Sequence, residues 1–227
     1  MSKSLIYKLL AKPMTGPEIE ARSFEIIDSE KGAFTAPRDQ WEIIRRMIHT
    51  CGDPSIATLV HFSPDAIRAG VAALRAGAPI YVDSNMIRSG LSLARLRSVN
   101  PSYTPEMITC NVAAPDIAAE AKRTGLPRSY FAVRKACATL NGGIAVFGNA
   151  PVALLEMNRM IAENELKPAL VIGLPVGFVH VEESKTELVS LPVPSIVMTG
   201  RRGGSTLAVS IVHALCTIAE WKREAGG

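Results

Sequence analysis

The stretch Gly143-Ile144-Ala145-Val146-Phe147-Gly148-Asn149-Ala150-Pro151 decides the fold. It begins as a short apolar run and ends as a turn, and a helical pattern with Leu154, Met157 and Ile161 follows. A short run without polar alternation predicts a strand that is covered on both faces, as strands in parallel sheets are. The stretch therefore predicts a strand, a turn and a helix in that order.

Four other short apolar runs are bounded by turn residues, and helical patterns separate them. They are residues 79–82, 107–110, 169–173 and 195–198. Right-handed connections between parallel strands place helices on both faces of a sheet. We therefore predict an α/β fold, a three-layer α/β/α sandwich around a mainly parallel sheet of about five strands.

The boundaries of the fold are also expected from the sequence. The chain has no linker, internal repeat or low-complexity tract, which favours a single domain over residues 1–227. Residues 1–20 are expected to form an irregular N-terminal arm, because two prolines and a glycine interrupt them. Ser63 and Pro64 have the character of an N-cap and a first helical residue, so a helix is predicted to begin within residues 61–65.

The composition is that of a globular protein and argues against several kinds of partner. Hydrophobic residues make up 48% of the chain and charged residues 20%, which argues against disorder. The net charge is only +4 and aromatic residues make up 5%, so the chain lacks the basic, aromatic-rich stripe of a nucleic-acid-binding protein. A mild positive excess suits a small polyanionic ligand.

The sequence indicates a cytoplasmic protein without a membrane segment. The most apolar segment, residues 169–181, is too short to span a bilayer, and the N-terminus lacks the apolar core of a signal peptide. The four cysteines lie far apart without a C-x-x-C pair. That spacing argues against a zinc site and against a disulfide framework, and it fits a reducing compartment.

Residues 41–51 predict an amphipathic helix, and the glycine and proline that follow cannot continue it. Glu42, Arg45, Arg46 and His49 are three or four residues apart and therefore share one face of that helix. One interpretation is a solvated polar face. The other is a site in which a titratable ring and a guanidinium meet at a helix terminus. Spacing alone leaves both open.

The loops after the predicted strands are candidate ligand sites, because open α/β sheets bind ligands beyond the carboxyl ends of their strands. Residues 200–205 combine three glycines, two arginines and a following helix. This loop is either an anion site or a tight turn whose arginines lie in solvent. Residues 182–185 are either a plain helix start or a segment from which Ser184 and Lys185 face a ligand.

Other catalytic patterns are absent from the sequence. The chain has no Walker sequence, no G-x-G-x-x-G and no G-x-S-x-G. His61, His180 and His213 have no spacing suited to a metal, and no base adjacent to a cysteine is identifiable.

Eight motifs, in order along nearly the whole chain, together resemble the precorrin-8X methylmutase family. They are Arg22-Ser23-Phe24, Arg46-Met47-Ile48-His49-Thr50-Cys51-Gly52, Phe62-Ser63-Pro64, Ala76-Gly77-Ala78-Pro79-Ile80, Gly148-Asn149-Ala150-Pro151, Pro175-Val176-Gly177-Phe178-Val179, Glu183-Ser184-Lys185 and Gly200-Arg201-Arg202-Gly203-Gly204-Ser205. The chain departs from the family pattern at four positions: His180, Val181, Glu182 and Arg202.

The resemblance implies an isomerase of corrin biosynthesis that moves a methyl group from C-11 to C-12 of precorrin-8, giving hydrogenobyrinate. With a cobalt-containing substrate the product is cobyrinate, and the sequence does not choose between the two forms. The resemblance implies that His49 is the proton donor or acceptor and that Ser23 and Arg46 contact substrate. It also implies a homodimer with an α/β sandwich. Further candidates for substrate binding are Asn149, Ser184, Lys185 and Arg201.

A chemical hypothesis follows for His49. Protonating a ring nitrogen would make the receiving system electron-poor and speed the methyl shift, and a general acid with a pKa near the working pH does this best. The helix terminus favours a protonated His49, while Arg46 opposes it by like-charge repulsion. A substrate with many carboxylates should neutralise Arg46, so we expect protonation of His49 to be coupled to ligand binding.

The expected partners follow from the same reaction. An intramolecular methyl shift needs no cofactor and no metal at the protein, so none is expected. The polycarboxylate tetrapyrrole product should bind tightly and be handed on transiently to other corrin-pathway enzymes. The alternatives are a non-catalytic tetrapyrrole (hydrogenobyrinate) carrier and an α/β enzyme that acts on another polyanionic ligand.

Overall fold

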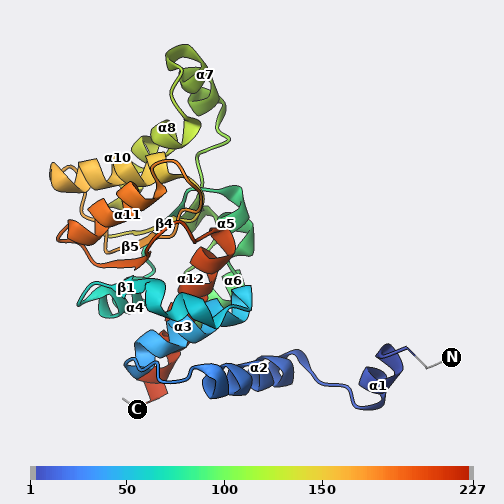
Figure 1. The fold of residues 1–227 in the computed structure, drawn as a ribbon. Coiled ribbons are helices and arrows are strands. Elements are labelled where there is room, and N and C mark those ends of the chain that lie inside the picture. The colour runs from blue at the N-terminus through green and yellow to red at the C-terminus, as the bar shows by residue number, and fades with distance from the viewer. Residues whose placement is uncertain (1–3, 225–227) are drawn as a thin grey trace.

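A computed structural model describes residues 4–224 as an α/β fold around one six-stranded sheet (Figure 1). The strands are β1 (Val60–Phe62), β2 (Ile80–Val82), β3 (Ile108–Thr109), β4 (Ile144–Phe147), β5 (Leu170–Gly173) and β6 (Ser195–Met198). Their order in the sheet is β1-β6-β5-β4-β2-β3, and every pairing is parallel except the antiparallel pair β1 and β6. The predicted mainly parallel sheet is confirmed, with one strand more than expected.

Helices cover both faces of this sheet, because successive side chains of each strand point to opposite sides. In β4, Ile144 and Val146 belong to one hydrophobic core, and Ala145 and Phe147 belong to a second core on the other face. Packed around the first core are α3 (Arg38–Cys51), α4 (Ala66–Arg75), α5 (Asn85–Gly90), α6 (Leu93–Val99) and α12 (Ser205–Glu224). Packed around the second are α8 (Arg128–Lys135), α9 (Cys137–Leu140), α10 (Pro151–Ala162) and α11 (Val181–Ser190). The three-layer sandwich is therefore confirmed.

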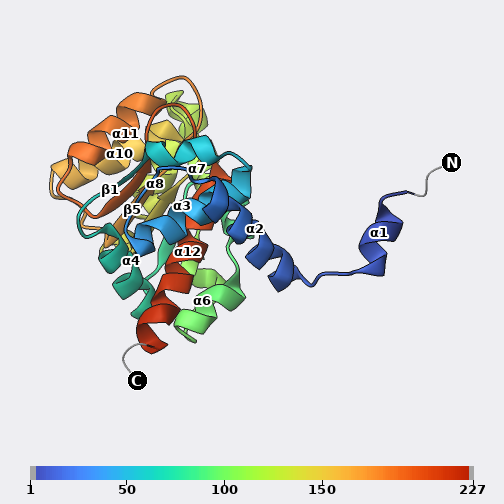
Figure 2. The same cartoon turned by 60° about the horizontal axis from the view of Figure 1, so that its bottom comes forward.

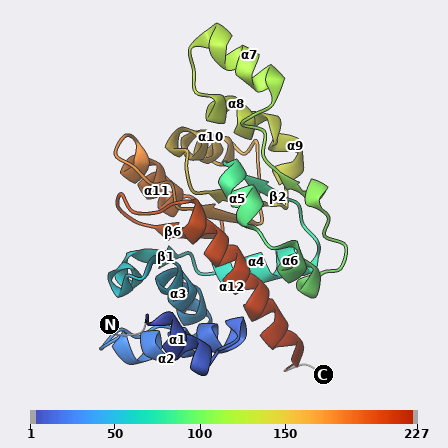
Figure 3. The same ribbon diagram turned by 90° about the vertical axis from the view of Figure 1, so that its right-hand side faces the viewer.

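Three further helical segments lie before β1 or between the later strands. They are the 3-10 helices η1 (Pro54–Leu59) and η2 (Pro105–Met107), and α7 (Pro115–Thr124). Helix α7 packs against α8 and projects from the body at the top of Figure 1. Helix α12 crosses the whole first layer and packs against α3, α4, α5 and α6 (Figure 3).

The helix expected to begin within residues 61–65 begins later, because the chain first adds a strand to the sheet. Strand β1 pairs with β6, and α4 starts only at Ala66. Ser63 does not cap that helix. Its hydroxyl accepts a hydrogen bond from Ser195 N at 2.8 Å, and its own N–H donates to Ser195 O at 2.9 Å, so it extends the pairing of the two strands.

Within residues 4–20 the N-terminal arm is mainly helical rather than irregular, and residues 1–3 of the expected arm lie outside the described residues. Helix α1 (Ile6–Ala11) and helix α2 (Gly16–Glu30) occupy most of it, and the arm leads away from the body (Figure 2). Thr15 caps α2 through a capping box with Glu18, and Pro17 lies in the first turn, where a missing N–H costs nothing. The glycine and proline therefore start a helix here instead of breaking one. Helix α2 packs against α3.

The carboxyl ends of β2 and β4 are joined by one buried side chain. Both carboxylate oxygens of Asp83 accept backbone N–H groups, from Gly148 at 3.1 Å, Asn149 at 2.8 Å and Ala150 at 2.7 Å. The hydroxyls of Ser84 and Ser205 lie 3.0 Å apart, so the same junction reaches the first residue of α12. This arrangement fixes the sheet edge at which the candidate site lies.

Gly148 lies against the start of α12 so closely that a side chain has no room. A Cβ atom at Gly148 would lie 2.8 Å from Ser205 Cα and 2.9 Å from Ser205 N. Because both neighbours are backbone atoms, they cannot yield as a flexible side chain would. We expect Gly148→Ala to lower the free energy of unfolding by about 1–3 kcal/mol, the usual cost of overpacking, measured by urea denaturation.

Gly16→Ala is the matched control, because a Cβ there meets nothing within 4 Å. The control should unfold at the wild-type midpoint. A Gly148→Ala protein that also unfolds at that midpoint would show that the start of α12 can move freely.

Candidate active site

His49 lies in the last turn of α3, as the sequence predicted. Gly52 ends the helix in the left-handed conformation, with φ 67°, and its N–H donates to Ile48 O at 2.7 Å. The His49 side chain is exposed, and its ring meets the Phe24 ring edge-on with 5.5 Å between centroids. Phe24 belongs to α2, so α2 forms one wall beside the histidine.

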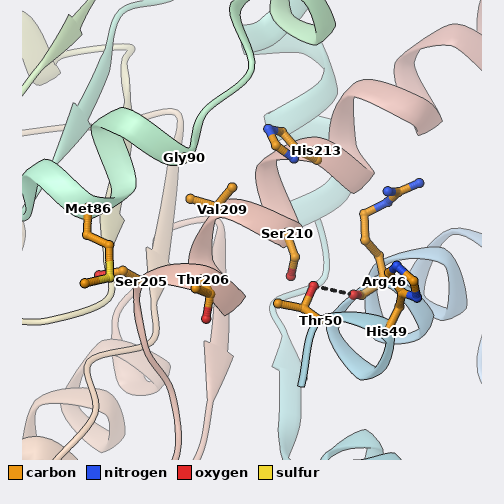
Figure 4. Close-up of a pocket in the computed structure, with 10 residues that line it drawn as sticks. All are labelled: Arg46, His49, Thr50, Met86, Gly90, Ser205, Thr206, Val209, Ser210 and His213. Atoms are coloured by element: carbon orange, nitrogen blue, oxygen red, sulfur yellow. Dashed lines mark hydrogen bonds between the residues drawn. The ribbon is translucent and has the colours of Figure 1, made fainter. Parts of the chain in front are cut away.

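A pocket of about 250 Å³ opens beside His49 between α3, α5 and α12 (Figure 4). Its lining residues are Arg46, His49, Thr50, Met86, Gly90, Ser205, Thr206, Val209, Ser210 and His213. Residues of α3 form one side, α5 forms the opposite side, and α12 lies between them. Thr50 Oγ1 donates to Arg46 O at 2.8 Å and so stays within its own helix.

His49 also lines two further hollows. One, of about 240 Å³, contains Ser23 of α2, and the other, of about 400 Å³, contains Glu20 of α2 and Arg95 of α6. Ligand pockets for organic molecules range from about 300 to 1,000 Å³. A large macrocycle would therefore extend over more than one of these hollows, and His49 is at their junction.

Arg46 is buried and already paired with carboxylates. Its Nη1 lies 2.9 Å from Glu20 Oε1, and its Nη2 lies 3.6 Å from Glu42 Oε1. Glu42 is only 2% exposed and also forms an ion pair with Arg45. The interpretation of this helix face as solvated is therefore wrong for Glu42 and Arg46. Arg46 therefore already has two carboxylate partners before any ligand binds, and the expected coupling between ligand binding and protonation of His49 stays a prediction.

His213 of α12 is a second histidine in the pocket, and it is held neutral. Its Nε2 accepts the N–H of Ser92 at 3.0 Å, which requires the unprotonated nitrogen. Burial, together with the positive charges of Arg95 and Arg46, lowers the pKa of His213 to about 4, and Glu20 offsets this only in part. At neutral pH the one acceptor nitrogen of His213 is therefore already occupied by Ser92, and the neutral ring can offer only its Nδ1–H as a hydrogen-bond donor.

The glycine-rich loop 200–205 is held by α11 and does not gather its arginines into one anion site. Lys185 is buried, and its Nζ donates to Gly200 O at 2.8 Å and to Arg202 O at 2.6 Å. Arg201 pairs with Glu182 at 3.1 Å, and Arg202 pairs with Asp53 at 2.7 Å. Both arginines are exposed.

The structure brings together three of the predicted site residues and separates the other four. Ser23, Arg46 and His49 meet at the hollows described above. Asn149 and Arg201 are exposed but do not line the hollows that contain His49, and Ser184 and Lys185 are buried. The Ser184 hydroxyl donates to Val181 O at 2.9 Å. Ser184 and Lys185 therefore hold the neighbouring loops through internal hydrogen bonds, and their contact with substrate stays a prediction.

Sequence reasoning missed Glu20, Arg95 and His213. Glu20 lies in a segment expected to be irregular, Arg95 had no local signal, and His213 was considered only as a metal ligand. The helical spacing of α12 could have pointed to His213, which lies four residues after Val209 on the same face as that pocket residue.

No three His, Cys, Asp or Glu side chains in the described part of the protein are grouped so that they could hold a metal ion. None of the helices between residues 4 and 224 is both long and apolar enough to cross a membrane.

Comparison with known proteins identifies the family of this chain. The sequence model of the precorrin-8X methylmutase family matches residues 18–218. The chain belongs to the precorrin-8X methylmutase family. Helix α1 lies outside the matched residues, whereas α3, α6 and most of α2 and α12 lie within them.

Individual members of the precorrin-8X methylmutase family are similar to this chain over most of their length. The cobalt-precorrin-8 methylmutase of Priestia megaterium is 41% identical over 211 residues, which is 92% of each chain. The precorrin-8X methylmutase of Pseudomonas aeruginosa is 38% identical over 207 residues, or 90% of this chain and 97% of that one. The crystal structure of the precorrin-8X methylmutase from Thermus thermophilus matches with a TM-score of 0.83 at 42% identity and covers 91% of this chain and 98% of its own.

The environment of His213 predicts a pH dependence of stability. An unfolded histidine has a pKa of about 6.5, and the folded value is about 4. Between these values the unfolded chain binds a proton that the folded chain does not, so stability is complete above pH 6.5 and falls as the pH falls toward 4. The loss attributable to His213 should reach at most about 3 kcal/mol, measured by urea denaturation at a series of pH values.

The variant His213→Gln keeps an oxygen that can accept the Ser92 N–H but cannot titrate. It should lose the part of the slope between pH 4 and 6.5 that belongs to this residue. An unchanged slope would mean that His213 is not the titrating group.

Proposed function

We propose that this protein is an isomerase of corrin biosynthesis that moves the methyl group at C-11 of precorrin-8, or of its cobalt complex, to C-12. The products are hydrogenobyrinate and cobyrinate, respectively. The observation that carries the proposal is the position of His49, an exposed histidine at the junction of three hollows in a chain of this family. Relatives named for the metal-free and for the cobalt-containing substrate both match, so the proposal includes both forms.

The reaction we propose uses His49 as a general acid that gives a proton to the macrocycle and takes it back. Protonation of a ring nitrogen withdraws electron density from the conjugated system, and the methyl group then migrates within the same molecule. The proton returns to His49 when the product forms, so nothing is oxidised or reduced. Proton transfer by a positioned side chain contributes about 10²- to 10⁴-fold to a rate.

Three features around His49 support that role. The C-terminal end of α3 carries partial negative charge, and His49 lies in its last turn. The Phe24 ring restricts the imidazole from one side. Ser23, whose hydroxyl donates to Ile19 O at 2.7 Å, lines the same hollow as His49 and offers its oxygen as an acceptor. We propose that Ser23 contacts the macrocycle.

The other predicted substrate contacts have unequal support. Arg46 lines the pocket with His49 and is proposed to bind a substrate carboxylate. Arg201 lies 5.5 Å from the ring centroid of Phe178, which is 82% exposed, and the pair forms part of the surface at the carboxyl edge of the sheet. We propose that Asn149 and Arg201 act only at the periphery of a bound macrocycle.

The proposal is tested with the variants His49→Asn and His180→Asn. Both histidines are exposed, but His180 lies at the start of α11 and outside the hollows around His49. Conversion of metal-free and cobalt-containing precorrin-8 would be followed by absorption. We expect His49→Asn to slow conversion by about 10²- to 10⁴-fold while product binding remains, and His180→Asn to match wild type.

The outcomes distinguish the proposal from its alternatives. Conversion by His49→Asn at the wild-type rate would contradict the assignment of the acid. A wild-type protein that binds hydrogenobyrinate but converts neither substrate would be a tetrapyrrole carrier.

We also propose that the protein is a cytoplasmic homodimer that hands its product on to other corrin-pathway enzymes. All four cysteines are free, which is consistent with a reducing compartment. Leu5, Leu9 and Leu10 of the arm are 64–73% exposed and provide apolar surface for an interface. Sedimentation equilibrium should give twice the chain mass of 24.3 kDa. A single chain mass at micromolar concentration would contradict the dimer.

A further inference from the structure

One carboxylate oxygen of Glu20 lies between two arginines from different helices. Glu20 Oε1 is 2.9 Å from Arg46 Nη1 and 3.7 Å from Arg95 Nη2. Glu20 comes from α2, Arg46 from α3 and Arg95 from α6. The hollow that contains Glu20 and Arg95 also contains His49. Two guanidiniums thus converge on one oxygen beside the proposed acid.

The positive charges of Arg46 and Arg95 affect the pKa values of two groups in the same region. Burial alone would raise the pKa of Glu20, but Arg46, with Arg95 and His49, outweighs burial, and the pKa is lowered. The positive charges of Arg95 and Arg46 also help to lower the pKa of His213 on the other side of the site. The arginines therefore create a positive potential between α3, α6 and α12 that an anionic group satisfies.

Glu20 satisfies this potential incompletely. It offers the same oxygen to both arginines, whereas a carboxylate binds guanidinium groups best when both of its oxygens are used. The 3.7 Å contact with Arg95 is longer than a hydrogen bond, and the Arg95 side chain is 41% exposed. Among the described side chains, none forms a hydrogen bond with the buried Nε of Arg46. A second carboxylate oxygen would therefore find a donor in the partly exposed Arg95 guanidinium.

The part of α2 that carries Glu20 is weakly attached to the body. Ile27, in the second half of the helix, is its one buried residue among those described, and Phe24 packs against the core beside it. Residues 16–19 are exposed, and this end of the helix leads out to the projecting arm (Figure 2). Glu20 can therefore withdraw by a local movement of the first turns of α2 without disturbing the core.

We propose that Arg46 and Arg95 form a carboxylate-binding site that Glu20 occupies in the free protein and gives up to an acetate or propionate side chain of the bound macrocycle. This inference rests on the proposed function. Glu20 is then an internal competitor of the ligand. A protein whose competent state is only partly populated binds with an apparent affinity reduced by that fraction, so removing the competitor tightens binding.

The test compares hydrogenobyrinate binding by wild type, Glu20→Gln and Glu25→Gln, using absorption titration of each full-length protein. Glu25 lies on the same helix but pairs with exposed Arg22, so Glu25→Gln is a matched loss of one carboxylate. We expect Glu20→Gln to lower the Kd about three- to thirtyfold and Glu25→Gln to leave it unchanged. Adding Arg95→Gln to Glu20→Gln should abolish the gain, because the site then lacks one of its two arginines.

The opposite result has a different physical meaning. If Glu20 only orients Arg46 and Arg95, its removal loosens both, and Glu20→Gln binds hydrogenobyrinate equally or more weakly than wild type. That result overturns this inference and leaves the proposed function intact. If wild type and Glu25→Gln both fail to bind hydrogenobyrinate or to convert precorrin-8, the proposed function fails, and this inference fails with it.

Discussion

The buried carboxylate of Asp83 is the interaction on which the rest of the site depends. A buried carboxylate is costly unless hydrogen bonds satisfy it, and here three consecutive backbone N–H groups do so. The loop after β4 must therefore follow the end of β2. The neighbouring Ser84 contacts Ser205, so the start of α12 follows as well. Helix α12 in turn packs against α3, and the position of His49 is set through this chain of contacts.

The sequence predicted those parts of the fold that depend on local patterns. The apolar runs at β2, β3, β4, β5 and β6 were predicted because strands buried on both faces need no polar residues. Strand β1 was missed because Ser63 and Pro64 also fit a helix start, and only the distant Ser195 decides between the two. The arm was wrongly predicted to be irregular, because the capping box of Thr15 and Glu18 lets the glycine and proline begin a helix.

The candidate site was predictable only where its residues share a helix. The spacing of Arg46 and His49 placed them on one face of α3, and the structure places both in one pocket. Glu20 contacts Arg46 and Arg95 through the tertiary packing of three helices, and no local sequence pattern predicts these contacts. The role of Lys185 could not be predicted from its place in a post-strand loop, because its hydrogen bonds to two backbone carbonyls depend on residues 15 and 17 positions away.

The contact of Gly148 with Ser205 has a consequence for how this site can change. A Cβ at Gly203 would likewise lie 2.2 Å from Leu174 O, so the floor beneath Ser205 of the pocket, made by the loops that support the start of α12, is backbone packed on backbone. Such a floor cannot be reshaped one side chain at a time. The walls differ, because Met86 of α5 is 66% exposed and the first turns of α2 are exposed as well. Substitutions that adapt the site to a new macrocycle, in nature or by design, are therefore expected in the walls and not in the floor.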